Sequence, residues 1–132
     1  MFPASQGNYD AAQTSYQGAL KIFENALGKG HPEVASFLNS LAGLLREKGQ
    51  YNDAKPLYKR ALKIRKKKLG SEHPDVATSL NNLARLLHSQ GQYDDAKPLY
   101  KRALEIREKK LGNKHPDVAI SLNDLARLLQ SR

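Results

Sequence analysis

Apolar residues recur along the chain at the spacing of an α-helix. One stripe of apolar side chains lies within residues 75–90, at Val76, Leu80, Leu83, Ala84 and Leu87. A second stripe lies within residues 94–111, at Ala96, Leu99, Tyr100, Ala103, Leu104 and Ile106. No segment shows the strict alternation of a strand. The pattern therefore predicts an all-α chain.

Signals for helix ends flank these stripes. Pro74 fits the first turn of a helix, and the acidic Asp75 beside it faces the positive end of the helix dipole. Gly91 tolerates the left-handed backbone that closes a helix. We expect Asp94 and Asp95 to provide the N-cap of the next helix. The same signals elsewhere predict about six helices, over residues 8–28, 33–48, 52–69, 75–90, 94–111 and 117–131.

The chain repeats itself with a period of 42 residues. Residues 31–72 and 73–114 are identical at 29 of 42 positions without a gap, and residues 73–90 recur as 115–132 with 14 of 18 identities. Residues 7–30 match 49–72 at 10 of 24 positions. Neither helix of a pair can bury its stripe alone, so neighbouring pairs must stack. We expect a right-handed superhelical solenoid of antiparallel helix pairs.

The repeat divides the chain into an N-terminal extension and an array. The extension is 1–6 and the array is 7–132. Within the array we expect the second helix of a partial repeat, two full repeats, and the first helix of another partial repeat, at 7–30, 31–72, 73–114 and 115–132.

Composition excludes several classes of protein. The absence of cysteine excludes disulfides and thiolate metal sites. The N-terminus lacks the basic start and apolar core of a signal peptide, and no apolar run approaches the roughly 18 residues that span a bilayer. We therefore expect a cytoplasmic protein with no membrane contact. The net charge is +9, and the basic excess lies within residues 31–114 rather than in a tail.

One set of residues resembles the tetratricopeptide repeat: Leu80, Leu83, Ala84, Leu87, Gly91, Tyr93, Ala96, Tyr100, Ala103 and Leu104. The ordinary repeat has about 34 residues. The longer period here, with the segments H-P-D-V-A, L-N-N-L-A and A-L-E-I-R-E-K-K-L-G, is similar to the kinesin light chain type of this repeat. The resemblance implies a scaffold that binds another protein, with neither enzymatic activity nor a cofactor.

The resemblance also implies a ligand groove lined by the first helix of each pair. Its candidate residues are Asn39, Arg46, Thr78, Asn81, Arg85, His88, Asn123 and Arg127. The recurring asparagines either hydrogen-bond the backbone of an extended peptide or bridge helices within the scaffold. The arginines favour an acidic segment of the partner, and their alternative is an ordinary solvated surface.

Two other groups of residues invite different interpretations. His31, His73 and His115 recur once per unit, too far apart for shared zinc coordination, so we interpret them as structural residues at the turn into each pair. The basic run 65–68 favours nucleic-acid binding only weakly. Successive residues spread around a helix, and Glu105 replaces Lys63 in the next unit.

The frame of the array suggests a further hypothesis. Because the array begins with a second helix and ends with a first helix, each terminal helix lacks its pair-mate and leaves apolar residues bare. The helix over 8–28 of one copy could dock on the helix over 117–131 of another, as a head-to-tail or domain-swapped assembly. The alternative is that the chain is a fragment of a longer array with tolerated ragged ends.

Overall fold

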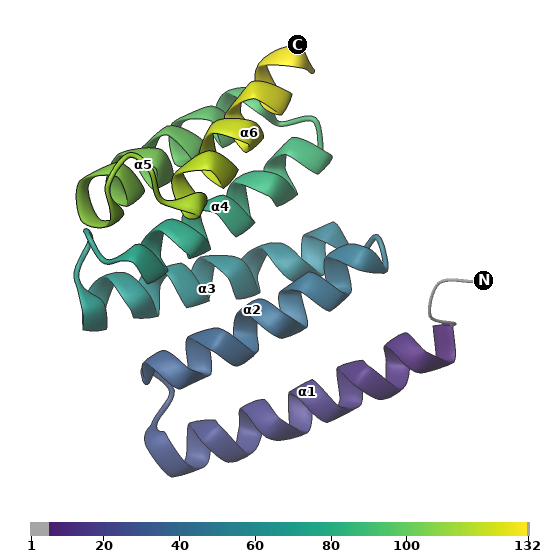
Figure 1. The fold of residues 1–132 in the computed structure, drawn as a ribbon. Coiled ribbons are helices and arrows are strands. Elements are labelled where there is room, and N and C mark those ends of the chain that lie inside the picture. The colour runs from purple at the N-terminus through teal and green to yellow at the C-terminus, as the bar shows by residue number, and fades with distance from the viewer. Residues whose placement is uncertain (1–5, 132) are drawn as a thin grey trace. The chain divides into compact units, whose positions relative to one another are not determined.

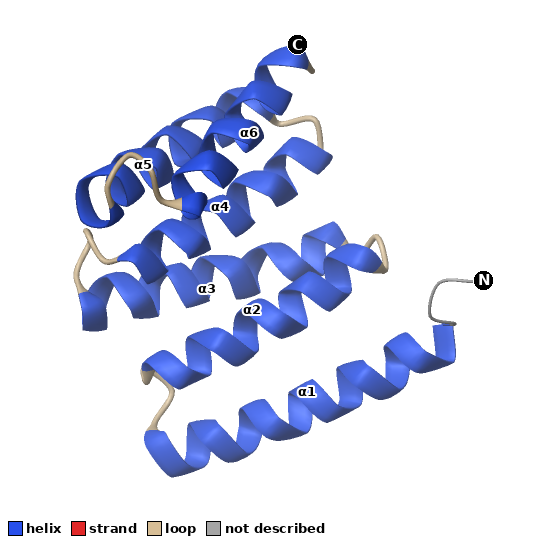
Figure 2. Ribbon diagram, viewed as in Figure 1, coloured by secondary structure: helices blue, strands red, loops and turns tan. Residues whose placement is uncertain are grey.

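The computed structural model describes residues 6–131, and all regular structure within them is helical (Figures 1 and 2). The helices are α1 (Gln6–Leu27), α2 (Pro32–Glu47), α3 (Tyr51–Leu69), α4 (Pro74–Ser89), α5 (Tyr93–Leu111) and α6 (Pro116–Gln130). Every predicted helix is present, with each end within two residues of its expected position. The all-α prediction is confirmed.

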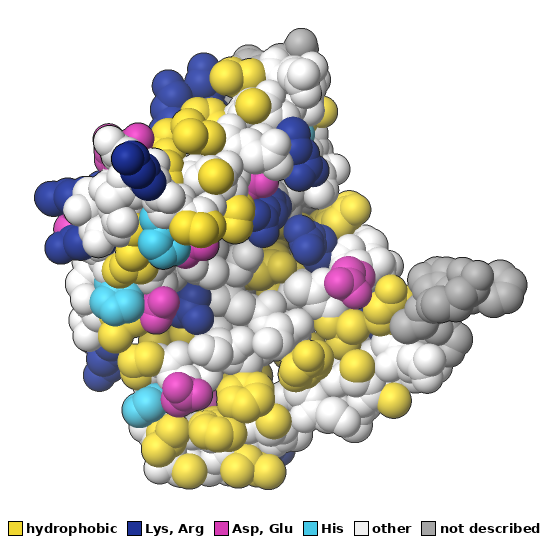
Figure 3. Space-filling view, viewed as in Figure 1, with side chains coloured by type: hydrophobic (Ala, Val, Ile, Leu, Met, Phe, Trp, Pro, Cys, Tyr) yellow, Lys and Arg dark blue, Asp and Glu magenta, His cyan; other side chains and the backbone are white. Residues whose placement is uncertain are grey.

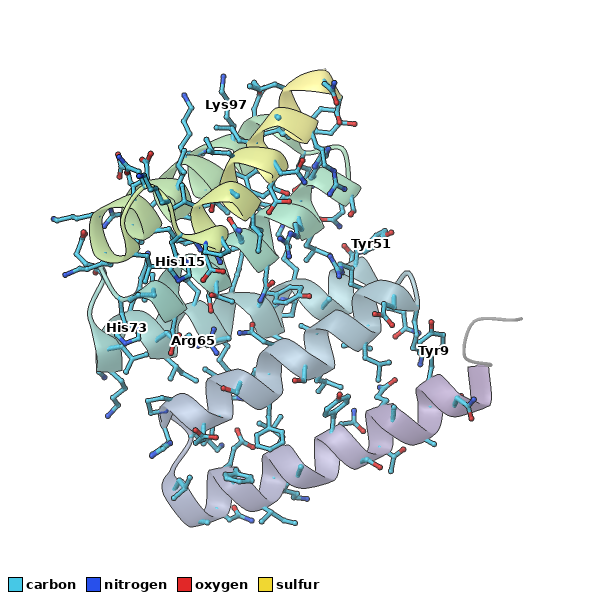
Figure 4. The ribbon with its side chains drawn as sticks, viewed as in Figure 1. Tyr9, Tyr51, Arg65, His73, Lys97 and His115 are labelled. Atoms are coloured by element: carbon cyan, nitrogen blue, oxygen red, sulfur yellow. The ribbon has the colours of Figure 1, made fainter. Side chains whose placement is uncertain are left out.

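A histidine side chain caps the N-terminus of α2, α4 and α6. Nδ1 of each histidine accepts a hydrogen bond from the backbone N–H two residues later, at 3.0–3.1 Å, in the pairs His31–Glu33, His73–Asp75 and His115–Asp117. These bonds satisfy N–H groups that have no partner inside the helix. Figure 4 labels His73 and His115 at the beginnings of α4 and α6. The interpretation of these histidines as structural residues is confirmed.

The predicted cap of α5 is wrong. The N-cap residue is Gln92, which makes no side-chain capping bond, and the helix begins at Tyr93. Asp94 and Asp95 therefore lie inside the first turn, where their charges still face the positive end of the helix. The chain turns just before this point at Gly91, whose φ of +77° disfavours any residue with a Cβ.

The chain divides into two compact units, residues 1–64 and 65–132, and the division falls within α3. In the first unit α1 packs against α2. Its core contains Val34, Ala35 and Leu38 from α2 and Ala61 and Ile64 from α3, with Leu20, Phe23 and Leu57 packed around them. Lys48 adds a polar tie, because its amine lies 2.8 Å from Oδ1 of Asp10.

In the second unit α5 packs against both α4 and α6, and α4 also contacts α6 (Figure 1). Ala84 of α4 and Ala96 of α5 are fully buried, as expected for small residues between closely packed helices. Tyr100 and Ile106 of α5 are also buried. This packing places the polar faces of α4 and α6 side by side.

Candidate functional site

A buried carboxylate joins the polar faces of α4 and α6. Oδ2 of Asp124, on α6, accepts hydrogen bonds from Nδ2 of Asn81 at 3.3 Å and from Nε and Nη2 of Arg85 at 3.2 and 2.8 Å. Oδ1 of Asp124 lies 4.0 Å from Nη1 of Arg127. Only 4% of the Asp124 side chain is exposed. Such a buried charge is tolerated because it is paired and hydrogen-bonded.

The two arginines at this carboxylate remain accessible. About a third of the Arg85 side chain is exposed, and 66% of the Arg127 side chain is exposed. Two guanidinium groups and one carboxylate leave a net charge of +1 at the site. We use the term α4–α6 polar face for the surface formed by Arg85, Asn123 and Arg127.

The three repeated asparagines lie in different environments. Asn81 is only 2% exposed, and its amide group is used within the fold by Asp124. Its Oδ1 is buried, as is Oδ1 of Asn39 on α2, and neither has a hydrogen-bond partner among the described residues. Asn123 is exposed on α6. Of the three side chains, Asn123 is the one open to a ligand.

The remaining candidate residues lie near helix ends. Thr78 is exposed near the beginning of α4, and its Oγ1 lies 3.4 Å from Nη2 of Arg107. His88, near the end of α4, has Nε2 2.9 Å from Oγ of Ser131 and packs edge-on against Tyr93. Arg46 is half-buried near the end of α2, in the first unit. The structure thus brings Asn81, Arg85 and Arg127 together at Asp124, with Thr78 and His88 towards the two ends of α4.

Asp124 itself was not among the candidates from the sequence. Its repeat equivalents are Asn82 and Ser40, so an acid appears at this position only in α6. The signal available in the sequence was this carboxylate, which lies three residues before Arg127 where the preceding repeat has the amide of Asn82. The sequence did not show that Arg85, 39 residues earlier, would share this carboxylate.

An arginine of α3 and one of α5, Arg65 and Arg107, form a second polar feature that sequence reasoning missed; Arg107 is buried and Arg65 is half-buried. Nη1 of Arg107 donates to Oγ of Ser121 at 2.9 Å, and Nη1 of Arg65 donates to Oγ of Ser79 at 3.1 Å. Burial lowers the pKa of Arg107, an effect opposed by the nearby charge of Asp117. Both arginines hydrogen-bond the helix that follows their own, so we assign them to the scaffold.

Metal-ligand clusters and membrane-spanning helices were both sought among the described residues. Within residues 6–131, no three histidine or acidic side chains come close enough together to hold a metal ion. Over the same residues, no helix combines the length and apolar character needed to cross a membrane.

Comparisons with known proteins support the fold. The family model of the tetratricopeptide repeat matches residues 4–67, 33–109 and 75–132. No curated protein sequence matches the chain. A solved structure of BtubC (BKLC) from P. vanneervenii is similar, with 28% identity over 95% of this chain and 50% of that one, and a TM-score of 0.86.

A putative kinesin light chain from Podosopora anserina, with nearly identical TPR-like repeats, is also similar. It shares 30% identity over 95% of this chain and 59% of its own, with a TM-score of 0.85. Its Q17M variant gives 29% identity and a TM-score of 0.84, with the same coverage. The chain thus spans between half and three fifths of the length of these proteins. The 42-residue repeats, the helix pairs and the family match agree, and the chain belongs to the tetratricopeptide repeat family, with repeats of the kinesin light chain type.

Proposed function

We propose that the chain binds an extended polypeptide segment across α4 and α6, the first helices of its second and third repeat units, with an acidic side chain of the partner at the α4–α6 polar face. Tetratricopeptide repeats generally mediate protein–protein interactions. The proposal that the partner is acidic rests on the pairing of Arg85 and Arg127 with one buried carboxylate, that of Asp124.

Asp124 prepares Arg85 for this role. A guanidinium group has five N–H donors, and the contacts with Asp124 use Nε and Nη2 of Arg85. Those contacts fix the plane of the group before a ligand arrives, which lowers the entropy cost of binding. The exposed Arg127 adds a second guanidinium, and a carboxylate of the partner can pair with it through two parallel hydrogen bonds.

Asn123 supplies a different kind of contact. It lies on α6 four residues before Arg127, so the two side chains share one face of the helix. An exposed amide both donates and accepts hydrogen bonds, which suits the backbone of an extended peptide. Asn81 supports this surface from below through Asp124, and we do not assign it a direct contact with the partner.

Isothermal titration with a matched pair of peptides tests the proposal. The two probes are unstructured ten-residue peptides that differ only in carrying two glutamates or two glutamines. We expect the glutamate peptide to bind the unmodified chain more tightly, and Arg127→Met to weaken its binding about tenfold. Lys101→Met, which removes an exposed positive charge from α5, is the control and should leave the affinity within about twofold. Equal affinity for both peptides, or no effect of Arg127→Met, would refute the assignment of an acidic partner.

Self-association is the second candidate function, and it depends on other residues. The observation that favours it is the exposure of Ile22 on α1 and of Leu122 and Leu129 on α6.

A further inference from the structure

The helix α6 carries an apolar face that its equivalents in the chain bury. Leu122 and Leu129 are 51% and 50% exposed. Their repeat equivalents are Leu80 and Leu87 in α4, which are buried, and α4 is covered by α5. Hydrophobic side chains gather over α6 in Figure 3. This face is therefore of the kind that receives the second helix of a pair.

The helix α1 carries the opposite half of the same interface. Ile22 is 68% exposed, whereas its repeat equivalents Ile64 and Ile106 are buried. In the first unit Ile64 shares a core cluster with Val34, Ala35 and Leu38 of α2. Those three residues correspond to Val118, Ala119 and Leu122 of α6, which are the same residue types. The exposed Ile22 and the exposed Leu122 are thus the two halves of a contact that the repeat makes elsewhere.

We propose that α1 of one copy docks on α6 of a second copy, in the register in which α3 packs on α2. The side chains at the contact positions agree with this register. Ala12, Tyr16, Ala19 and Ile22 of α1 have the identical equivalents Ala54, Tyr58, Ala61 and Ile64 in α3. On α6, Val118, Leu122, Leu125 and Leu129 repeat Val34, Leu38, Leu41 and Leu45 of α2. The occupant of the α6 face is therefore a helix of this chain's own pattern.

The exposure of the other α1 residues supports the same docking. Ala12, Tyr16 and Ala19 are half-buried, while their equivalents in α3 are buried. A second copy would complete their burial. The contact joins two different surfaces, so it is heterologous, and each added copy leaves a new α1 and a new α6 face for the next. This inference makes the second candidate function specific and does not depend on peptide binding at Arg127.

Sedimentation velocity over a hundredfold range of concentration tests the association. We expect the average mass of the unmodified chain to rise with concentration. The double variant Leu122→Glu, Leu129→Glu should stay at the monomer mass, and it should fold normally because both side chains are half exposed. Lys101→Glu on α5 changes the net charge by the same amount and should still associate. A constant monomer mass for the unmodified chain would overturn the proposal.

Crosslinking tests the register. His88 and Tyr93 lie with ring centroids 5.4 Å apart where α4 meets α5, and their equivalents at the proposed contact are Gln130 and Tyr9. The chain contains no cysteine, so single cysteines report specific sites. A mixture of Gln130→Cys and Tyr9→Cys chains should give a crosslinked dimer with a short thiol-reactive reagent. A mixture of Gln130→Cys and Asn25→Cys, at the other end of α1, should not. Equal crosslinking of the two mixtures would reject the register, and Arg127→Met should not affect either mixture.

Discussion

Arg107 donates a hydrogen bond from Nη1 to Oγ of Ser121 at 2.9 Å, and both side chains are buried. The equivalent pair one repeat earlier is Arg65 and Ser79. At the same repeat positions in the first unit the residues are Phe23 and Phe37, whose ring centroids lie 4.7 Å apart. The contact between α5 and α6 is thus polar, as is the contact between α3 and α4. The equivalent contact between α1 and α2 is aromatic.

We predict that Arg107→Met lowers the free energy of unfolding by about 2 kcal/mol, because the variant loses the hydrogen bonds to Ser121 and to the Asp117 carbonyl. Urea denaturation followed by circular dichroism measures the change. Lys101→Met, on the exposed surface of the same helix, should stay within about 0.5 kcal/mol of the unmodified chain. Equal effects of the two substitutions would show that the Arg107 bridge contributes little.

The aromatic pair in the first unit predicts a coupling between these positions. Arg107→Phe and Ser121→Phe should each destabilise the chain, because each leaves a polar or bulky side chain without its partner. The double variant can form a ring contact like that of Phe23 and Phe37, and it should be about 1 kcal/mol more stable than the two single effects predict. A double-mutant cycle in urea measures this coupling, and additive single effects would contradict it.

The histidine caps predict a difference between two substitutions at one position. His73→Ala removes the acceptor for the Asp75 N–H and should cost about 1 kcal/mol of stability. His73→Asn supplies a side-chain oxygen at the N-cap and should restore most of that loss. Thermal unfolding of the two variants measures the difference. If both variants melt together, the imidazole does not act as the cap.

Glu72 predicts a pH dependence of stability. Hydrogen bonds from Arg102 lower the pKa of the Glu72 carboxyl below its ordinary value of 4.5, with a further contribution from Lys109. A carboxyl whose pKa is lowered by folding stabilises the folded state above its ordinary pKa, and this contribution is lost as pH falls through the lowered value. Glu72→Gln should therefore reduce the melting temperature at pH 7 slightly and by less at pH 3. A difference that grows on acidification would contradict this assignment.

The helices could be predicted from the sequence because the signals for them are local and repeated. Pro74, Gly91 and the apolar stripes act within one or two turns, and each recurs 42 residues away. The cap of α5 was mispredicted because Asp94 and Asp95 suit both an N-cap and a first turn, and the turn at Gly91 decides between these positions.

The candidate site was less predictable because its contacts join distant helices. Asn39, Asn81 and Asn123 are the same residue at the same repeat position, yet Asn81 is buried against Asp124 while Asn123 is exposed. Repeat alignment identifies which residues share a face and leaves open which of them are used within the fold.

The most direct test of the proposed function is to map the backbone amide signals of the isotope-labelled chain by NMR during titration with the glutamate peptide. The account predicts that the largest shifts occur at Arg85, Asn123 and Arg127, on the polar faces of α4 and α6, and that the glutamine peptide produces much smaller ones. Unchanged signals at these residues, or shifts confined to the lysines of α3 and α5, would contradict it.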